Sequence, residues 1–395
     1  MPTRDGVPAP SRRGLCAWYQ GLLWTAAGVW WPFLFPLVAG RGVGFARLGL
    51  LVAVWPATAL LAQPLAGWLC DRSGRTRVVQ CLLSLGAAAV LPLFGIVSGL
   101  APELAVVVAF ALLNAPSVPL ADALTVAQLQ KVGGDYGGVR LWGSAGFAVA
   151  GIAAGLAVHL GWIQPSGLLV VGAVLTVPVA LLALAFPADV RGLAPRAPAG
   201  AVLQARPLLT LLGLFALVLV PMNAHSTYFS LYLAHLGGGA VFQGAGWALP
   251  ALVEVPFFLW GPRVQRRLGV RRTLVIAFAC QGLSLAAVAL AGSPLAATAG
   301  ALLQGPAFAL FYGAAVPAVD RLAPPGLRAS GQALLWASCF GAGSVAANLG
   351  AAWGAAALGP AGLYRAMAGW SLAATLVFAL LAPRTDPQGA EAGGI

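Results

Sequence analysis

Long apolar runs dominate the chain and alternate with short polar segments. A helix needs about 20 mostly apolar residues to cross the hydrocarbon core of a membrane. Twelve stretches reach this length, and they predict twelve transmembrane helices at 15–39, 46–70, 78–98, 102–128, 140–161, 166–186, 207–233, 241–260, 272–292, 296–319, 329–353 and 362–382. The fourth stretch is the most interrupted, because Asn114, Pro116, Pro119 and Asp122 fall within it. We expect the first stretch to be retained, since its apolar run is longer than that of a cleaved signal.

Composition agrees with an integral membrane protein. Of the 395 residues, 60% are hydrophobic and only 8% are charged, whereas a soluble protein carries about 25% charged residues. A soluble enzyme, a disordered protein and a nucleic-acid-binding module are therefore poor descriptions. The 51 glycines and 29 prolines fit this class, because membrane helices tolerate both residues.

The positions of the basic residues predict the orientation in the membrane. With the N-terminus in the cytoplasm, all but three of the 22 Lys and Arg residues lie in segments that face the cytoplasm; the exceptions are Arg41, Arg47 and Arg365. Such a bias is typical of cytoplasmic loops. We therefore expect a multi-pass protein of the cytoplasmic (inner) membrane with both termini in the cytoplasm. The net charge of +12 then reflects topology and indicates no nucleic-acid partner.

The two halves of the chain resemble each other. The loop Gly67–Arg77 and the loop Gly261–Arg272 are both rich in Gly and Arg and occupy corresponding positions, and Arg140 and Arg328 each begin an Arg-x-x-Gly motif. Similarity at this spacing predicts a six-plus-six duplication. The expected organisation is a cytoplasmic tail at 1–14, a six-helix bundle at 15–186, a cytoplasmic linker at 187–206, a second bundle at 207–382 and a cytoplasmic tail at 383–395.

This organisation resembles the major facilitator superfamily over nearly the whole chain. The run Gly67–Arg77 is similar to the superfamily signature G-x-x-x-D-R-x-G-R-x-R between spans 2 and 3. The run Tyr136–Phe147 resembles the Y-G-x-x-R-x-W-G-S-x-G-F segment of the phenylpropionic-acid-permease-like group, which is related to the oligosaccharide/proton symporters. His225 and Glu254 fit the same group, while Gln304 stands where the group has a histidine. The resemblance implies an all-α fold of twelve transmembrane helices and alternating access to a central cavity.

Glu254 is the sharpest candidate for chemistry, because an ionisable side chain at membrane depth is costly and marks a functional site. It lies in span 8 between Pro250 and Pro256, which predict an irregular helix that lines a cavity. A carboxyl group in such a place can load a proton on one side of the membrane and release it on the other. The alternative is a structural acid paired with an arginine across the cavity.

Asp122 is the second candidate. It lies near the cytoplasmic end of span 4, on the same helix face as Asn114 by the i, i+8 spacing. Arg140 opens span 5, and we expect it to pair with Asp122 as part of a cytoplasmic gate. Direct contact with the substrate and an exposed acid at the boundary are the alternatives. Glu254 and Asp122 are together the predicted proton-coupling residues.

Polar and aromatic side chains at helical spacing are candidates for the substrate cavity. Trp24 and Trp31 share a face of span 1, and His225 and Tyr228 share a face of span 7. Such faces can stack on a sugar ring or an aromatic acid, although packing, helix–helix hydrogen bonds and anchoring at the membrane interface are alternatives. The predicted cavity residues are Gln20, Trp24, Trp31, Asn114, Asn223, His225, Tyr228, Gln304, Phe308, Tyr312, Gln332 and Trp336.

The loop after span 2 is predicted to control conformation and not to bind substrate. The resemblance implies that Asp71 latches onto span 11, at the positive end of a helix, and favours the outward-open state. Gly67 and Gly74 are expected to permit a close helix contact and a tight turn. The predicted conformational gate comprises Gly67, Asp71, Arg72, Gly74, Arg75, Arg140 and Arg328. We also expect the basic loops to contact anionic membrane lipids.

Missing motifs narrow the function. The chain has no G-x-x-x-x-G-K-[ST], H-E-x-x-H or G-x-S-x-G motif, and its five cysteines and three histidines are scattered. We therefore expect no enzyme, ATP-driven pump, metal site or cofactor. The prediction is a monomeric secondary transporter that moves a small organic solute with protons as a symporter. Proton-antiport efflux is the alternative, although span 5 lacks the proline of the efflux signature, and a non-transporting receptor or scaffold is a minor one.

Overall fold

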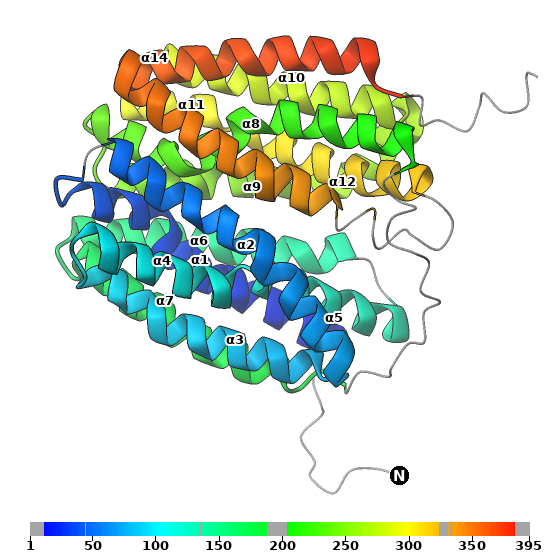
Figure 1. The fold of residues 1–395 in the computed structure, drawn as a ribbon, viewed down its shortest axis with the longest axis horizontal. Helices are drawn as coiled ribbons and strands as arrows, with labels where there is room; N and C mark the ends of the chain where they lie inside the picture. The colour runs from blue at the N-terminus through cyan, green and yellow to red at the C-terminus, as the bar shows by residue number, and fades with distance from the viewer. Residues whose placement is uncertain are drawn as a thin grey trace, which may run out of the picture.

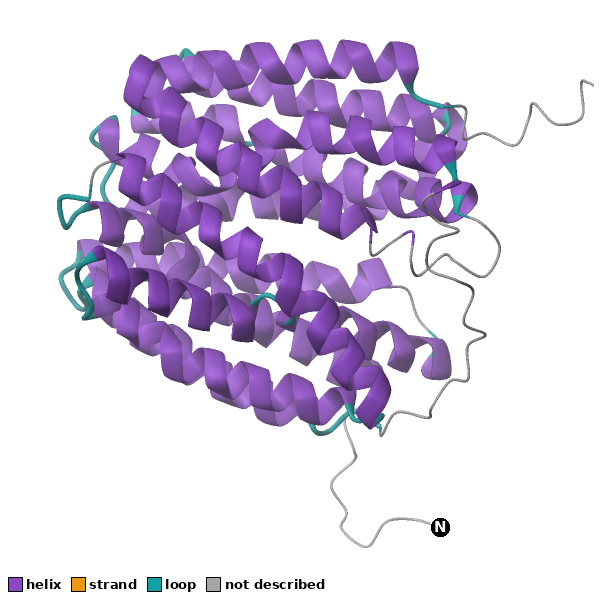
Figure 2. Cartoon of the chain, viewed as in Figure 1, coloured by secondary structure: helices purple, strands orange, loops and turns teal. Residues whose placement is uncertain are grey.

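The computed structural model describes residues 12–43, 45–133, 136–187, 204–323, 331 and 334–383. Within these ranges the secondary structure is helical and contains no strand. Long helices run side by side and form two bundles, one stacked on the other (Figures 1 and 2). Because lipid offers no hydrogen bonds to the backbone, helices that satisfy their own N–H and C=O groups are the expected solution.

The bundles follow the order of the chain. The first contains α1 (Arg12–Ala39), α2 (Phe45–Ser73), α3 (Thr76–Val90), the 3-10 helix η1 (Leu91–Gly95), α4 (Leu100–Asn114), α5 (Ser117–Val132), α6 (Tyr136–His159) and α7 (Pro165–Ala183). The second contains α8 (Arg206–His235), α9 (Ala240–Leu268), α10 (Val270–Ala289), α11 (Pro294–Ala301), α12 (Gln304–Leu322), the π-helix η3 (Ala337–Ala342) and α14 (Gly343–Leu381).

The number of membrane crossings agrees with the prediction. Eleven helical stretches of the described chain are long and apolar enough to cross a membrane, and the last of these, Leu334–Leu381, has 48 residues. It holds two helices, because the backbone breaks at Gly359 (φ +70°), directly before Pro360. The predicted class, an all-α membrane protein of twelve transmembrane helices in two six-helix halves, is confirmed.

Two local predictions had different outcomes. The expected interruption of span 4 is present, since α4 ends at Asn114 and α5 begins at Ser117. The expected irregularity around Glu254 is wrong, because α9 continues through Pro250 and Pro256 as one helix. A proline removes one backbone donor, and a membrane helix tolerates this loss where its neighbours pack closely.

The predicted domain boundaries remain predictions. The tails at 1–14 and 383–395 and the linker at 187–206 lie largely outside the described residues. The described helices nevertheless divide into the two groups that the internal repeat predicts (Figure 1).

The two halves meet closely near one face of the molecule. We call the face at which α1 begins the proximal face, on the right in Figure 1, and the face at which α1 ends the distal face. Toward the distal face, a Cβ on Gly49 of α2 would collide with Ala352 of α14, and one on Gly244 of α9 would collide with the Gly151 carbonyl of α6. The ribbons of the two bundles diverge toward the proximal ends of α5 and α12 (Figure 1). The distal side is therefore the side on which the halves are closed against each other.

Each half packs around its own aromatic core. In the second half, Phe215, Phe278, Phe311 and Phe378 are buried, with ring centroids 4.9 to 6.1 Å apart for the contacting pairs. In the first half, Trp30, Phe94 and Phe110 are buried in a separate cluster. Two separate cores allow each bundle to move as a unit.

A π-helix interrupts the helix that follows residue 334. It spans Ala337–Ala342, and the Asn223 side chain of α8 donates a hydrogen bond of 2.8 Å to the Cys339 carbonyl within it. Turns of this kind are rare and often lie at functional sites. The contact fixes this segment against α8.

Candidate functional site

Polar side chains gather where the middle of the first half meets the second half. Seven residues, joined by hydrogen bonds and electrostatic contacts, form what we call the central polar cluster: Gln20 and Trp24 of α1, Asp122 of α5, Tyr136, Arg140 and Ser144 of α6, and Glu254 of α9. Four of the seven (Gln20, Asp122, Arg140 and Glu254) come from the small set of charged or amide side chains within the spans.

Asp122 is held by hydrogen bonds from two helices. Its Oδ1 accepts a bond of 2.6 Å from the Tyr136 hydroxyl and one of 3.1 Å from the Gln20 amide. The same amide nitrogen lies 3.1 Å from the Thr125 hydroxyl oxygen, and the Gln20 carbonyl accepts a bond of 3.2 Å from the Trp24 indole. Because Gln20 is fully buried, these partners fix its position and thereby support the Asp122 carboxyl group.

The expected ion pair between Asp122 and Arg140 is not formed. No nitrogen of Arg140 lies within 4.0 Å of the Asp122 carboxyl, and the guanidinium carbon instead lies 4.2 Å from the centroid of the Trp24 ring. The prediction was wrong because Tyr136 and Gln20 occupy the carboxyl group while the Trp24 face holds the cation. Arg140 still interacts electrostatically with both Asp122 and Glu254, so its charge acts on both acids.

Glu254 lies at the junction of the two halves. Its Oε2 accepts a hydrogen bond of 3.3 Å from the Ser144 hydroxyl, which belongs to the first half. Gly305 of α12 packs against this part of α9, since a Cβ on Gly305 would lie 2.7 Å from the Pro250 carbonyl and 3.1 Å from the Glu254 nitrogen. The carboxyl group therefore touches the first half directly, and no arginine of the described chain lies within 4.0 Å of it.

An aromatic wall in the second half borders the central polar cluster. Tyr312 has ring-centroid distances of 4.6 Å to Phe308, 5.6 Å to Trp336 and 6.3 Å to Phe340. All four side chains are half-buried, and Tyr312 interacts electrostatically with Asp122, Arg140 and Glu254. The structure thus brings together the predicted residues Phe308, Tyr312 and Trp336. It adds Phe340, which the sequence could have indicated by its i+4 spacing from Trp336.

The residues predicted on span 7 lie elsewhere. His225 is buried inside the second half, where its Nδ1 is 3.1 Å from the Tyr364 hydroxyl and its ring is 4.4 Å from that of Phe229. Asn223 bonds the π-helix. The Tyr228 hydroxyl is buried without a hydrogen-bond partner, beside the Gly49–Ala352 contact. None of these three side chains joins the central polar cluster. The contact of His225 with Tyr364 is the helix–helix hydrogen bond that was the alternative to a cavity role.

Three further cavity candidates are spread along the molecule. Trp31 packs toward the distal face with Phe35 and Trp55. Asn114 makes none of the hydrogen bonds of the central polar cluster, and α4 ends at this residue, before the helix that carries Asp122. Gln304 begins α12, and its amide nitrogen is buried without a hydrogen-bond partner.

The loop after α2 matches part of its prediction. Gly74 has φ +60° and makes the expected tight turn. A Cβ on Gly67 would meet no described atom within 4 Å, so the close contact expected there stays a prediction. The Arg72 guanidinium lies 5.3 Å from the Trp68 ring on its own helix, and Arg75 is exposed at the start of α3. The Asp71 side chain, Arg328 and Gln332 lie outside the described residues, so the latch stays a prediction.

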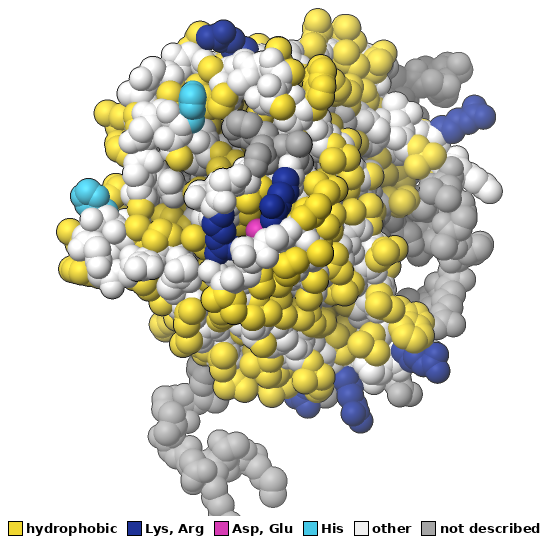
Figure 3. Space-filling view, turned by 60° about the vertical axis from the view of Figure 1, so that its left-hand side comes forward, with side chains coloured by type: hydrophobic (Ala, Val, Ile, Leu, Met, Phe, Trp, Pro, Cys, Tyr) yellow, Lys and Arg dark blue, Asp and Glu magenta, His cyan; other side chains and the backbone are white. Residues whose placement is uncertain are grey.

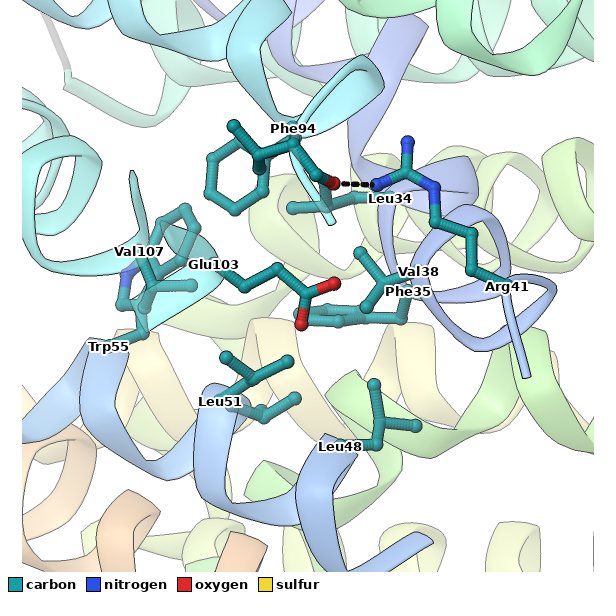
Figure 4. Close-up of a pocket in the computed structure, with 12 residues that line it drawn as sticks. Leu34, Phe35, Val38, Arg41, Leu48, Leu51, Trp55, Phe94, Glu103 and Val107 are labelled. Atoms are coloured by element: carbon teal, nitrogen blue, oxygen red, sulfur yellow. Dashed lines mark hydrogen bonds between the residues drawn. The ribbon is translucent and has the colours of Figure 1, made fainter. Parts of the chain in front are cut away.

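A half-buried ion pair near the distal face was not predicted. Glu103 of α4 pairs with Arg47 of α2 at 2.8 Å, and the distal face shows basic side chains next to an acidic one (Figure 3). A cavity of about 20 Å³ lies beside Glu103, and Arg41 borders it while donating a hydrogen bond of 2.7 Å to the Val97 carbonyl (Figure 4). This volume suits one water molecule and no organic solute. The sequence could have indicated this pair, because Arg47 and Glu103 lie near the distal ends of neighbouring helices.

Two other features add no chemistry. A groove of about 910 Å³ runs between α1, α6 and α7, and its lining is mostly apolar, from Trp18 and Trp142 to Ile163, without a charged side chain. Within the described part of the chain, no group of three His, Cys, Asp or Glu side chains could hold a metal ion.

Known proteins resemble this chain over most of its length. The family model described as "MFS_1 like family" matches residues 20–363. The maltose permease of Geobacillus stearothermophilus is 29% identical over 275 residues, which are 68% of this chain and 69% of that protein. A probable 3-phenylpropionic acid transporter of Escherichia coli (strain K12) is 27% identical over 266 residues, 64% of this chain and 68% of that protein. A crystal structure of a mutant of the nucleoside transporter NupG shares the fold, with a TM-score of 0.82 and 17% identity over 93% of this chain and 98% of that one.

Proposed function

The chain belongs to the MFS_1-like family of the major facilitator superfamily, and from this premise we propose that it moves a small organic solute across the cytoplasmic membrane together with protons. In this proposal it is a monomeric secondary transporter that works by alternating access. The proximal face, where α1 begins, is the cytoplasmic face. Relatives named for maltose and 3-phenylpropionic acid support a small organic solute.

The observation that carries the proposal is the contact between Ser144 and Glu254. A carboxyl group that is hydrogen-bonded across the two halves changes its surroundings whenever the halves move apart. Such a change can make proton binding favourable in one state and unfavourable in the other, which is what coupling requires. Asp122 has two donors and a nearby arginine within its own half, and in this proposal it is the second coupling residue.

The proposed solute site lies between the central polar cluster and the aromatic wall. Arg140 supplies hydrogen-bond donors on one side, and Tyr312 and Trp336 supply aromatic faces on the other. A solute with a ring and a polar group can stack on the aromatic faces while it bonds the donors. Residues of both halves form this site, so the contacts of a bound solute change when the halves move relative to each other.

The packing of the two halves supports the proposal of alternating access. They are closed against each other near the distal face, and each has its own aromatic core. In the proposed cycle the bundles rock as units, and the close glycine contacts separate when the distal side opens.

Uptake into proteoliposomes tests the proposal. The probes are radiolabelled maltose, 3-phenylpropionate and uridine, first ranked by thermal shift, since a bound solute raises stability. A gradient of about one pH unit can drive about tenfold accumulation, because 1.4 kcal/mol corresponds to a factor of ten. Glu254→Gln keeps an acceptor for Ser144 but cannot carry the proton, and we expect it to abolish accumulation while solute exchange persists.

Glu103→Gln is the matched control, because it makes the same chemical change at a buried acid outside the site. It should accumulate solute as the wild type does. Undiminished accumulation by Glu254→Gln would remove this residue from coupling. Movement of solute toward the acidic side, against the direction of proton flow, would identify an antiporter.

A further inference from the structure

A second group of buried polar side chains lies inside the first half, behind Asp122. Tyr19 on α1, Gln80 and Ser84 on α3, and Gln128 on α5 are each at most 2% exposed. All but Ser84 lie within about two helical turns of the proximal ends of their helices. We call Tyr19, Gln80 and Gln128, taken together, the Tyr19 pocket.

The Tyr19 pocket contains polar atoms that the protein does not pair. The Tyr19 hydroxyl, the Gln80 Oε1 and both amide atoms of Gln128 are buried without a hydrogen-bond partner. The Gln80 nitrogen makes only a long bond of 3.4 Å to the Ser84 hydroxyl. Each unpaired buried group costs about 1–3 kcal/mol, and such groups in folded proteins ordinarily bind ordered water.

The chemistry of the unpaired atoms favours water over an ion. Gln128 presents an unpaired donor, Nε2, and unpaired acceptors are present on both Gln128 and Gln80. A cation would satisfy only the acceptors, and an anion would satisfy only the donors. A water molecule donates two hydrogen bonds and accepts others, and therefore fits the whole set.

The Tyr19 pocket is connected to Asp122. The Tyr19 hydroxyl interacts electrostatically with the Asp122 carboxyl and faces the Gln80 amide. The next residue, Gln20, bonds both Asp122 and Thr125, and Thr125 lies one helical turn from Gln128. The groups that face Asp122 are therefore Tyr19 and Gln20 from α1, Tyr136 and Arg140 from α6, and Tyr312 from α12.

The other end of the pocket lies near the proximal surface. Arg77, one turn before Gln80 on α3, donates hydrogen bonds to the carbonyls of Phe186 (3.0 Å) and Leu184 (3.4 Å), just beyond the end of α7. The Phe186 ring packs against the Tyr19 ring at 5.0 Å. The pocket thus lies between this surface and Asp122.

The second half is packed differently around its buried glutamine. Its core is closed by four phenylalanines, Phe215, Phe278, Phe311 and Phe378, and its buried Gln281 donates a bond of 3.1 Å to the Val218 carbonyl. Unpaired buried polar atoms also occur in the second half, at Tyr228, Thr298, Gln304, Asn348 and Ser371; the Tyr19 pocket differs from these by its electrostatic contact with Asp122.

We propose that Tyr19, Gln80 and Gln128 hold water and form a path through which Asp122 exchanges protons with the cytoplasm without using the solute cavity. The inference rests on the proposed function, in which the proximal face is cytoplasmic. In one exchange the Asp122 carboxyl gives a proton to the Tyr19 hydroxyl, which passes its own proton to the water. One proton leaves for the cytoplasm, and a carboxylate remains. Asp122 can then discharge while solute still occupies the cavity.

Radiolytic labelling of the full chain in nanodiscs tests the hydration directly. Hydroxyl radicals formed from bound water oxidise a neighbouring tyrosine even where bulk solvent is excluded. Tyr19 and Tyr364 are both at most 1% exposed, but the Tyr364 hydroxyl is already bonded to His225. We expect Tyr19 to be oxidised severalfold faster than Tyr364. Equal, slow oxidation of both would show a dry pocket and overturn the proposal, whether or not the protein transports protons.

Transport by Gln80→Leu and Gln128→Leu tests the proton path. Net uptake requires Asp122 to release its proton in each cycle, whereas solute exchange with the probes above does not. We expect net uptake to fall severalfold in both variants while exchange stays at the wild-type rate. Gln281→Leu is the matched control, since it removes a buried glutamine from the other half, and it should show no such split.

The failures can be told apart. A parallel loss of net uptake and exchange, or no loss of either, would overturn the proton path and leave the symport proposal intact. Solute uptake by the wild type without proton movement would overturn the symport proposal and the path together. Thermal unfolding of each variant identifies any that fails to fold, and Tyr19→Phe then provides a smaller change that should give the same split.

Discussion

The Ser144 hydroxyl of the first half donates a hydrogen bond of 3.3 Å to the Glu254 carboxyl of the second half. The bond lies at the inner end of the α6–α9 contact, whose distal end is closed by Gly151 and Gly244. One pair of helices therefore carries both the seal between the halves and the contact of the buried acid.

Ser144→Ala should weaken this closed arrangement. Loss of one hydrogen bond costs about 1 kcal/mol, which shifts a two-state equilibrium about fivefold toward separation of the distal ends. Spin labels at His159→Cys and Gly239→Cys, both exposed, would report the shift as a growing long-distance population. Ser230→Ala is the control, because it removes a bond from Trp247 within the second half. Equal effects of the two substitutions would contradict the prediction.

Gly244→Ala should open the distal seal more strongly. The added methyl group meets the Gly151 carbonyl, and neither backbone can yield while the helices stay in contact. We expect Ala248→Cys, a buried position one turn further in, to react faster with an impermeant maleimide. Gly213→Ala meets nothing within 4 Å and should leave the reaction unchanged. An unchanged rate in the Gly244 variant would mean that the seal lies elsewhere.

Tyr228→Phe should be neutral or stabilising by up to about 1 kcal/mol, because it removes a buried hydroxyl that has no partner. Tyr364→Phe should instead destabilise by about 1 kcal/mol, since it leaves His225 Nδ1 unpaired. Denaturant unfolding of the two variants against the wild type measures the contrast. If both variants lose the same stability, then Tyr228 has a partner in the folded protein.

Arg47→Leu should cost about 3 kcal/mol of stability, because it leaves the buried Glu103 carboxylate unpaired. Glu103→Leu should cost less, since the Arg47 side chain is 35% exposed and can reach water. The double variant should recover most of the loss. Purely additive effects in this double-mutant cycle would show that the pair is not coupled.

The helices were predictable because the membrane fixes their length and composition. The span at 207–233 became α8 at Arg206–His235, and the proline-containing span 4 broke where its sequence indicated. The exception is α9, where two prolines predicted an irregularity that the packed helix does not show. Local propensity is a weak guide where tertiary packing is dense.

The members of the site were more predictable than their arrangement. Glu254 and Asp122 stood out because acids are scarce in the chain, and both lie in the central polar cluster. The partner of Asp122 was mistaken, and His225 lies inside one half instead of between the halves. Both errors have one cause. A helix that is apolar on every face carries no pattern that fixes its rotation, so spacing alone cannot say which neighbour a side chain meets.

One residue of the π-helix sets the geometry of two distant surfaces. Each residue of an α-helix advances the side-chain direction by about 100°, and the wider turn at Ala337–Ala342 holds a residue that a regular helix would not. Trp336 before it faces Tyr312, while Ala352 after it meets Gly49. If a related chain lacks one residue at this point, the part of the helix beyond the π-helix is therefore rotated relative to the part before it. It would present a different face to the distal seal and leave the aromatic wall in place.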